Sequence, residues 1–194
     1  MLGAIKYGLS KLLDPSGRDG RQTFWYFVLF VVVLRFVAGM VISIPLTTRT
    51  ITSAVEAAKA GADPAAAQAQ TMAAVTAMMP QLAYYGMAVG AVSMLLLAAA
   101  LVRRLHDSDM SGWWVLLPGA IYAYALARTP EQVAKAMEIM QHMDGKTPPN
   151  PMTMMQGQGA MMILPWIPVL IAIWFGVRAS TPGPNRFGDA PVNF

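Results

Sequence analysis

The residue types best suited to chemistry are concentrated at residues 103–109, which read Arg-Arg-Leu-His-Asp-Ser-Asp. A histidine can act as a general acid or base when a carboxylate orients its ring. Adjacent helical residues point about 100° apart, however, so His106 and Asp107 are poorly placed for a direct hydrogen bond. The only nearby hydroxyls, Ser108 and Ser111, belong to no nucleophile motif. Catalysis is therefore the least favoured of three interpretations.

The arginines of this stretch support the other two interpretations. Arginine and aspartate form short, charge-assisted hydrogen bonds, so Arg–Asp pairs could lock the ends of neighbouring helices together. Converging arginines could instead bind phosphate groups, such as those of anionic lipids. Both remain open, and the structural interpretation is favoured. The polar cluster that we consider comprises Arg18, Arg21, Arg103, Arg104, His106, Asp107, Asp109 and Arg186.

The composition of the chain indicates a membrane environment for this cluster. Of the 194 residues, 56% are apolar and only 12% are charged, whereas soluble domains carry about 25% charged residues. The basic residues do not form the contiguous block that nucleic-acid binding favours, so we expect no nucleic-acid partner. Cysteine is absent, which excludes disulfides and thiolate metal sites. We expect no cofactor.

Apolar runs predict an all-α, polytopic membrane protein with about four membrane segments. About 20 apolar residues suffice to cross the hydrocarbon of a bilayer. The third segment is short and contains Pro118 and Gly119, so whether it spans fully stays open. The predicted segments are residues 24–46, 81–102, 113–127 and 160–177.

The remaining residues are predicted to lie outside the hydrocarbon. Residues 1–23 begin with an amphipathic interfacial helix, residues 103–112 form a loop, and residues 178–194 form an ordered, non-helical tail. Two helical insertions, residues 47–80 and 128–159, separate the segments. The first membrane segment is expected to end near Pro45. Ser53 and Glu56 form a capping box that would start a helix ending at Gly61. Further helices are expected to start at Asp63-Pro64 and at Thr129-Pro130.

The distribution of lysine and arginine predicts the orientation of the chain. Residues 1–23, 103–112 and 178–194 together carry more basic residues than the two insertions. Positive charge near the ends of membrane segments marks the cytoplasmic side. We therefore expect a multi-pass membrane protein with both termini in the cytoplasm.

Small residues in the second segment predict close helix packing. Gly86 and Gly90 form a GxxxG pair, which lets a second helix approach closely. That helix could belong to the same chain, which is favoured, or to a second copy in a homo-oligomer.

One charge falls inside a predicted membrane segment. A charge at the centre of the bilayer costs at least about 2.5–3.5 kcal/mol, and no predicted segment holds an acidic residue that could pair with Arg35. Arg35 shares a helix face with Gly39 and Ser43, so we expect it to face the bundle interior, to extend toward the membrane surface, or to meet backbone carbonyls and water. An ion or solute path through Arg35 is an alternative, but one arginine without an acidic partner gives it little support.

A methionine-rich stretch raises a further hypothesis. Thioethers are soft ligands that suit Cu(I), and a candidate site would comprise Met137, Met140, His142 and Met143. The same spacing is typical of the apolar stripe of an amphipathic helix. We favour the stripe and predict no metal.

Three motifs of the chain resemble those of the DUF805 family, bacterial inner-membrane proteins of unknown function. They are Gly17-Arg18 with Arg21 and Phe24-Trp25, residues 103–107 with Ser111-Gly112-Trp113-Trp114, and residues 181–188 followed by Pro191. The two insertions look longer than the usual connections of the family. The resemblance implies a small helical inner-membrane protein and brings no activity with it.

These observations favour a non-enzymatic scaffold, or a module that interacts with lipid or phosphate groups. The expected partners are the bilayer, anionic lipids, and either another membrane protein or a second copy. The alternative is a transport component that uses Arg35. A membrane enzyme that uses His106 and Asp107 ranks third.

Overall fold

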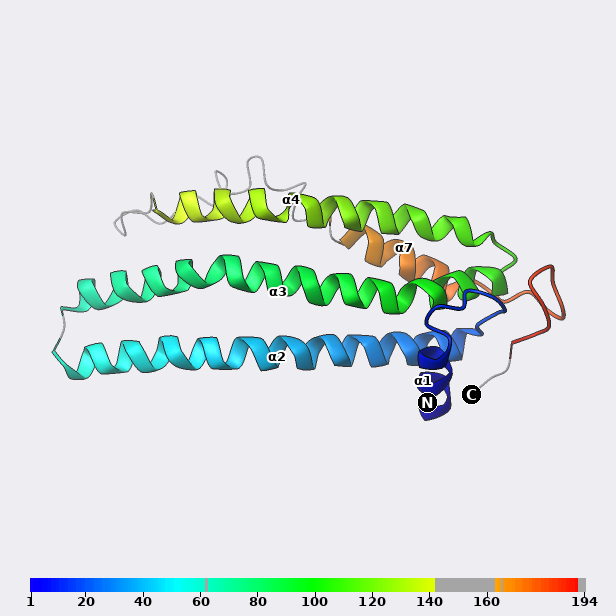
Figure 1. The fold of residues 1–194 in the computed structure, drawn as a ribbon, viewed down its shortest axis with the longest axis horizontal. Coiled ribbons are helices and arrows are strands. Elements are labelled where there is room, and N and C mark those ends of the chain that lie inside the picture. Colours follow the sequence, from blue (N-terminus) through cyan, green and yellow to red (C-terminus); the bar gives the residue numbers. More distant parts are fainter. Residues whose placement is uncertain (62, 142–162, 165, 192–194) are drawn as a thin grey trace.

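The computed structural model describes residues 1–61, 63–141, 163–164 and 166–191, and these residues form an all-helical bundle (Figure 1). The only β interaction among them is an isolated bridge between Asn185 and Gly188. This confirms the predicted all-α class. The helices are α1 (Leu2–Ser10), α2 (Arg21–Lys59), α3 (Pro64–Asp107), the short 3-10 helix η1 (Gly112–Val115), α4 (Leu116–Gln141) and α7 (Trp166–Val177).

Two long helices, α2 and α3, lie side by side and run in opposite directions (Figure 1). The turn between them follows local sequence signals. Gly61 adopts a positive φ of 70° just after α2 ends, a conformation that glycine adopts without steric cost. Asp63 then caps α3 by accepting a hydrogen bond from the backbone N–H of Ala65, with Pro64 as the first helical residue. The predicted stop and start are both confirmed.

Other predicted helix boundaries are wrong. α2 continues through Pro45 and Ser53, and the Ser53 hydroxyl donates to the carbonyl of Thr50 instead of capping a new helix. α4 likewise continues through Pro130, and the Thr129 hydroxyl donates to the carbonyl of Ala125. A proline inside a helix removes one backbone hydrogen bond, but packing against neighbouring helices outweighs local propensity. The first predicted insertion is therefore a direct continuation of α2 and α3.

The apolar character of α2 and α3 supports a membrane protein. By length and composition, both helices could cross a bilayer, whereas the apolar helix α7 is shorter. Large apolar side chains in the middle of α2, such as Phe36 and Val41, are each 67% exposed. Extended apolar surface of this kind marks a face that meets lipid or another protein. The prediction of four membrane segments stays a prediction.

The packed core lies at the end of the bundle where α3 ends. Phe27 on α2 packs over Gly8 of α1, where a Cβ atom would overlap the aromatic ring. Gly176 on α7 leaves similar room, because a Cβ atom there would lie 2.8 Å from the rings of Phe24 and Trp25. The buried core residues are Phe24, Phe27, Val31, Ala100, Leu101, Leu105 and Phe175. Close backbone approaches thus hold α1 and α7 against α2.

The two glycines of the GxxxG pair in α3 differ in how closely a neighbouring helix packs against them. A Cβ atom on Gly90 would overlap the hydroxyl of Tyr122 on α4, whereas a Cβ atom on Gly86 would meet nothing within 4 Å. Gly90 therefore packs against a neighbour in the same chain, as favoured from the sequence. Within the described residues, Gly86 makes no such contact.

We expect Gly90→Ala and Gly86→Ala to have opposite effects on stability. The methyl group at position 90 must displace the Tyr122 ring, and overpacking of this kind costs about 1–3 kcal/mol. At position 86 there is room, and alanine in a helix is more favourable than glycine by about 0.5–1 kcal/mol. Unfolding of the detergent-solubilised variants measures both. Equal effects of the two substitutions would contradict this packing.

Candidate functional site

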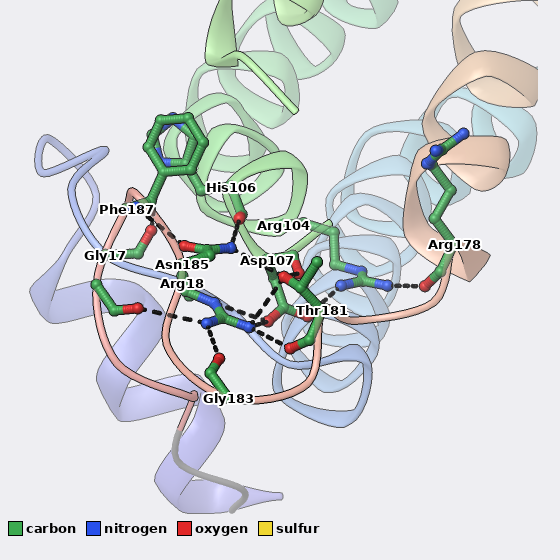
Figure 2. Close-up of polar contacts among 11 residues, drawn as sticks. Gly17, Arg18, Arg104, His106, Asp107, Arg178, Thr181, Gly183, Asn185 and Phe187 are labelled. Carbon is green, nitrogen blue, oxygen red and sulfur yellow. Dashed lines mark hydrogen bonds and ion pairs between the residues drawn. The ribbon is translucent and has the colours of Figure 1, made fainter. Parts of the chain in front are cut away.

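The polar cluster surrounds the C-terminal end of α3 (Figure 2). Arg103, Arg104 and Asp107 are completely buried, and Arg18 and Asp19 are nearly so. We call these five residues the buried cluster. Removing a charge from water costs several kcal/mol unless partners with good geometry replace the water. The partners of each residue therefore show what the cluster does.

Asp107 is shared by two arginines. Its Oδ1 accepts from Nη2 of Arg18 at 3.0 Å, and its Oδ2 accepts from Nη1 of Arg104 at 2.5 Å. Arg18 also donates to the backbone carbonyls of Thr181 at 2.8 Å and Gly183 at 2.6 Å. Arg18 thus connects the N-terminal segment, the end of α3 and the C-terminal tail (Figure 2).

Arg104 connects the same carboxylate to the end of α7. Its Nε donates to the carbonyl of Gly176 at 3.0 Å, and its Nη2 donates to the carbonyl of Arg178. The last carbonyls of a helix have no partner within the helix. Arg104 therefore caps the C-terminal end of α7.

Arg103 points to the other side of α3. Its Nε lies 3.0 Å from both carboxylate oxygens of Asp19, and its Nη1 donates to the carbonyls of Lys11 at 2.8 Å and Asp14 at 2.6 Å. The guanidinium also lies 5.6 Å from the centre of the Tyr7 ring. Burial raises the pKa of Asp19, and the positive charge of Arg103 opposes that rise. Adjacent arginines thus hold different segments of the chain.

The C-terminal tail is an ordered, non-helical loop, as predicted, and it also caps α3, which was not predicted. Both the backbone N–H and the hydroxyl of Thr181 donate to the carbonyl of Asp107, at 2.9 and 2.8 Å. The amide Nδ2 of Asn185 donates to the carbonyl of His106 at 2.8 Å, and its Oδ1 accepts from the N–H of Phe187. Gly183 supplies a positive φ of 72° in this loop.

His106 and Asp107 do not form a pair. The His106 ring stacks on Phe187 with 3.9 Å between ring centres, and its Nδ1 lies 3.3 Å from the carbonyl oxygen of Gly17. The Asp107 carboxylate is bound by arginines instead (Figure 2). The nearby Ser111 hydroxyl accepts a hydrogen bond from the N–H of Trp113. Within the described residues, Asp107 therefore does not orient the His106 ring, and the buried hydroxyl of Ser108 has no hydrogen-bond partner.

Four of the predicted cluster residues lie outside the buried group. Arg186 and Asp109 form an exposed ion pair with 3.1 Å between Nε and Oδ1. Arg21, the first residue of α2, is exposed and has no hydrogen bond or ion pair within the described residues. His106 packs at the edge of the cluster. The structure therefore places all eight predicted residues at the same end of the bundle, and Arg21 makes no pair there, although its charge acts on Arg104.

Sequence reasoning missed three important members, Asp19, Thr181 and Asn185. Asp19 had a signal, because two adjacent buried arginines require a second carboxylate, and Asp19 directly follows Arg18. Thr181 and Asn185 lie within the motif at residues 181–188, but their contacts with the end of α3 span more than 70 residues of sequence. No local pattern reveals such contacts.

The two other predicted sites lie away from the cluster. Arg35 on α2 is exposed and lines a cavity together with Gly90 and Tyr122. The methionine hypothesis cannot be followed as a site: Met137 lies in α4, but the Met140 side chain, His142 and Met143 lie outside the described residues. Within the described residues, no group of three or more histidine or acidic side chains could hold a metal ion.

Residues 12–189 match a family model described as "Protein of unknown function (DUF805)". The chain belongs to the DUF805 family. The matched region includes the buried cluster and the tail that caps α3. No curated protein and no solved structure matches the chain.

We expect Asp107→Asn to destabilise this DUF805 protein far more than Asp109→Asn. Removing the Asp107 charge leaves two buried guanidinium groups without their shared anion, and breaking a buried pair in this way costs about 3–5 kcal/mol. Asp109 loses only an exposed pair, worth about 0–1 kcal/mol. Unfolding of both variants in detergent makes the comparison. Similar losses would show that burial does not govern the strength of these pairs.

Proposed function

We propose that this chain is a non-enzymatic module of a bacterial inner membrane that binds anionic lipid headgroups at its cytoplasmic end. The proposal rests on one observation: some arginines at this end are buried in hydrogen bonds and ion pairs, whereas others have no such partners. Arg18, Arg103 and Arg104 are buried and fully engaged with carboxylates and carbonyls. Their role is structural, as favoured from the sequence. Lipid binding therefore falls to arginines without such partners.

Within the described residues at this end of the bundle, Arg21 and Arg178 are those arginines. Arg21 is exposed at the start of α2 and has no partner within the described residues. The Arg178 guanidinium lies 5.1 Å from the centre of the Trp174 ring, and its buried Nε has no hydrogen-bond partner in the described part of the chain. Phe24 and Gly176 are in close contact, so the start of α2 and the end of α7 lie at the same end of the bundle.

Exposed tryptophans at this end support a position at headgroup depth. Trp113 and Trp114 follow directly after α3 and are 77% and 51% exposed, and Trp174 is 54% exposed. Tryptophan is enriched where a membrane meets water, because its ring is apolar and its N–H is polar. Each arginine near an anionic membrane surface contributes about 1 kcal/mol of attraction. Exposed tryptophans beside unpaired arginines thus suit a lipid-binding rim.

The alternative of a transport component rests on Arg35 alone. Arg35 does line a cavity within the bundle. The other wall residues are mostly apolar, and an apolar wall offers poor replacement for the water around an ion or a small polar solute. The geometry therefore favours lipid interaction over a polar solute path.

We expect the double variant Arg21→Gln/Arg178→Gln to bind phosphatidylglycerol at least about tenfold more weakly than the wild type, because it lacks two positive charges that would attract the headgroup. Native mass spectrometry of the delipidated full chain, titrated with phosphatidylglycerol and with neutral phosphatidylcholine, measures the affinities. Binding of phosphatidylcholine should not change.

The matched control is Arg49→Gln/Lys59→Gln, which removes two exposed positive charges farther along α2. It should bind phosphatidylglycerol like the wild type. If both double variants lose the same affinity for phosphatidylglycerol, the loss reflects net charge and not the position of the arginines. If neither variant loses affinity, Arg21 and Arg178 do not bind the headgroups.

A further inference from the structure

A cavity within the bundle contains a single charged side chain. Arg35 of α2 lines it, together with residues of α3, η1, α4 and α7, and its volume is about 190 Å³. An apolar cavity of about 150 Å³ in another protein is large enough to bind benzene. The apolar part of the wall includes Met94, Leu97, Val115, Val169 and Ala172. The cavity thus has room for part of an acyl chain.

Two hydrogen-bond donors converge at one place in this cavity. The position that a Cβ atom of Gly90 would occupy is in contact with the Tyr122 hydroxyl and lies 3.7 Å from Nη1 of Arg35. The absence of a side chain at Gly90 is therefore what lets the Tyr122 hydroxyl lie over α3, and Nη1 of Arg35 lies within van der Waals distance of the same position. A guanidinium only donates hydrogen bonds, and a tyrosine hydroxyl can donate as well. A ligand bound here must supply acceptors.

The positive charge of Arg35 has no counter-charge among the residues that the structure describes. Arg35 has no ion pair or hydrogen bond within the described residues, and no wall residue of the cavity is acidic. A guanidinium remains protonated in proteins, and an uncompensated charge in an apolar membrane setting is costly. An anion from outside the chain would remove that cost.

We propose that this cavity binds an anionic amphiphile, with its acyl chain along the apolar wall and its carboxylate or phosphate oxygens on Arg35 and Tyr122. Charge complementarity requires the anion, and the apolar wall requires the chain. Arg35 lies 14 residues after Arg21, or about 21 Å along the axis of α2. The site is therefore separate from the proposed lipid-binding rim and stands without it.

The test measures binding of three probes to the delipidated full chain in detergent: palmitate, phosphatidylglycerol and the uncharged methyl palmitate. We expect Arg35→Gln to weaken binding of the charged probes about tenfold, the loss of one charged hydrogen bond, and to leave methyl palmitate unchanged. Arg49→Gln removes the same charge from the same helix outside the cavity and should bind all three probes like the wild type.

A second variant keeps the proposal testable if Arg35→Gln fails to fold. Ala98→Leu fills the cavity, which Ala98 lines, without changing any charge, and should weaken binding of palmitate and methyl palmitate alike. A palmitate with a photoreactive chain end should label wall residues such as Met94 or Ala172. The rim variant Arg21→Gln/Arg178→Gln should leave palmitate binding and this labelling intact, which separates the two proposals.

Preference for palmitate would identify a free carboxylate as the ligand group, and preference for phosphatidylglycerol would identify a headgroup phosphate; either supports the site. Three results would overturn it: no binding of either charged probe to the wild type, equal binding to wild type and Ala98→Leu, or labelling confined to residues outside the cavity.

Discussion

The structure depends on one shared anion, the carboxylate of Asp107, which binds two buried guanidinium groups. Arg18 reaches it from the segment before α2, and Arg104 reaches it from one turn earlier on α3. Two arginines cannot stay buried beside each other without such an anion, because mutual repulsion would add to the cost of desolvation. The requirement brings the N-terminal segment, the end of α3 and the C-terminal tail to one point, although they lie far apart in the sequence.

The cluster still holds more positive than negative charge, and helix ends supply the difference. Three guanidinium groups face only two carboxylates, those of Asp19 and Asp107. Arg103 binds the carbonyl of Lys11 directly after α1, and Arg104 binds the carbonyl of Gly176 in the last turn of α7. The C-terminal end of a helix carries partial negative charge. Two helix ends therefore complete the electrostatic balance and are fixed in place by it.

Local sequence signals correctly predicted the helix boundaries that depend on backbone conformation. They failed where contacts between helices determine the structure. Asp63-Pro64 and Gly61 set a real boundary, since capping and a positive φ are local properties. Pro45 did not end a helix, because α2 packs against α3 both before it, in the buried core, and after it, where the Thr50 hydroxyl contacts the sulfur of Met78. Within the site, the angle between adjacent helical residues correctly excluded a His106–Asp107 bond. The actual neighbours, such as Phe187 beside His106, come from contacts across the whole chain and have no local signal.

The buried cluster and the cavity at Arg35 share one structural element, α7. Arg104 fixes the end of α7, and Gly176 sets its close approach to α2. Pro168, Val169 and Ala172 of the same helix form one wall of the cavity. A helix of 12 residues has little stability of its own, so the position of that wall depends on how its end is held. The buried arginines thus help to shape the cavity lined by Arg35, which has no partner in the described part of the chain.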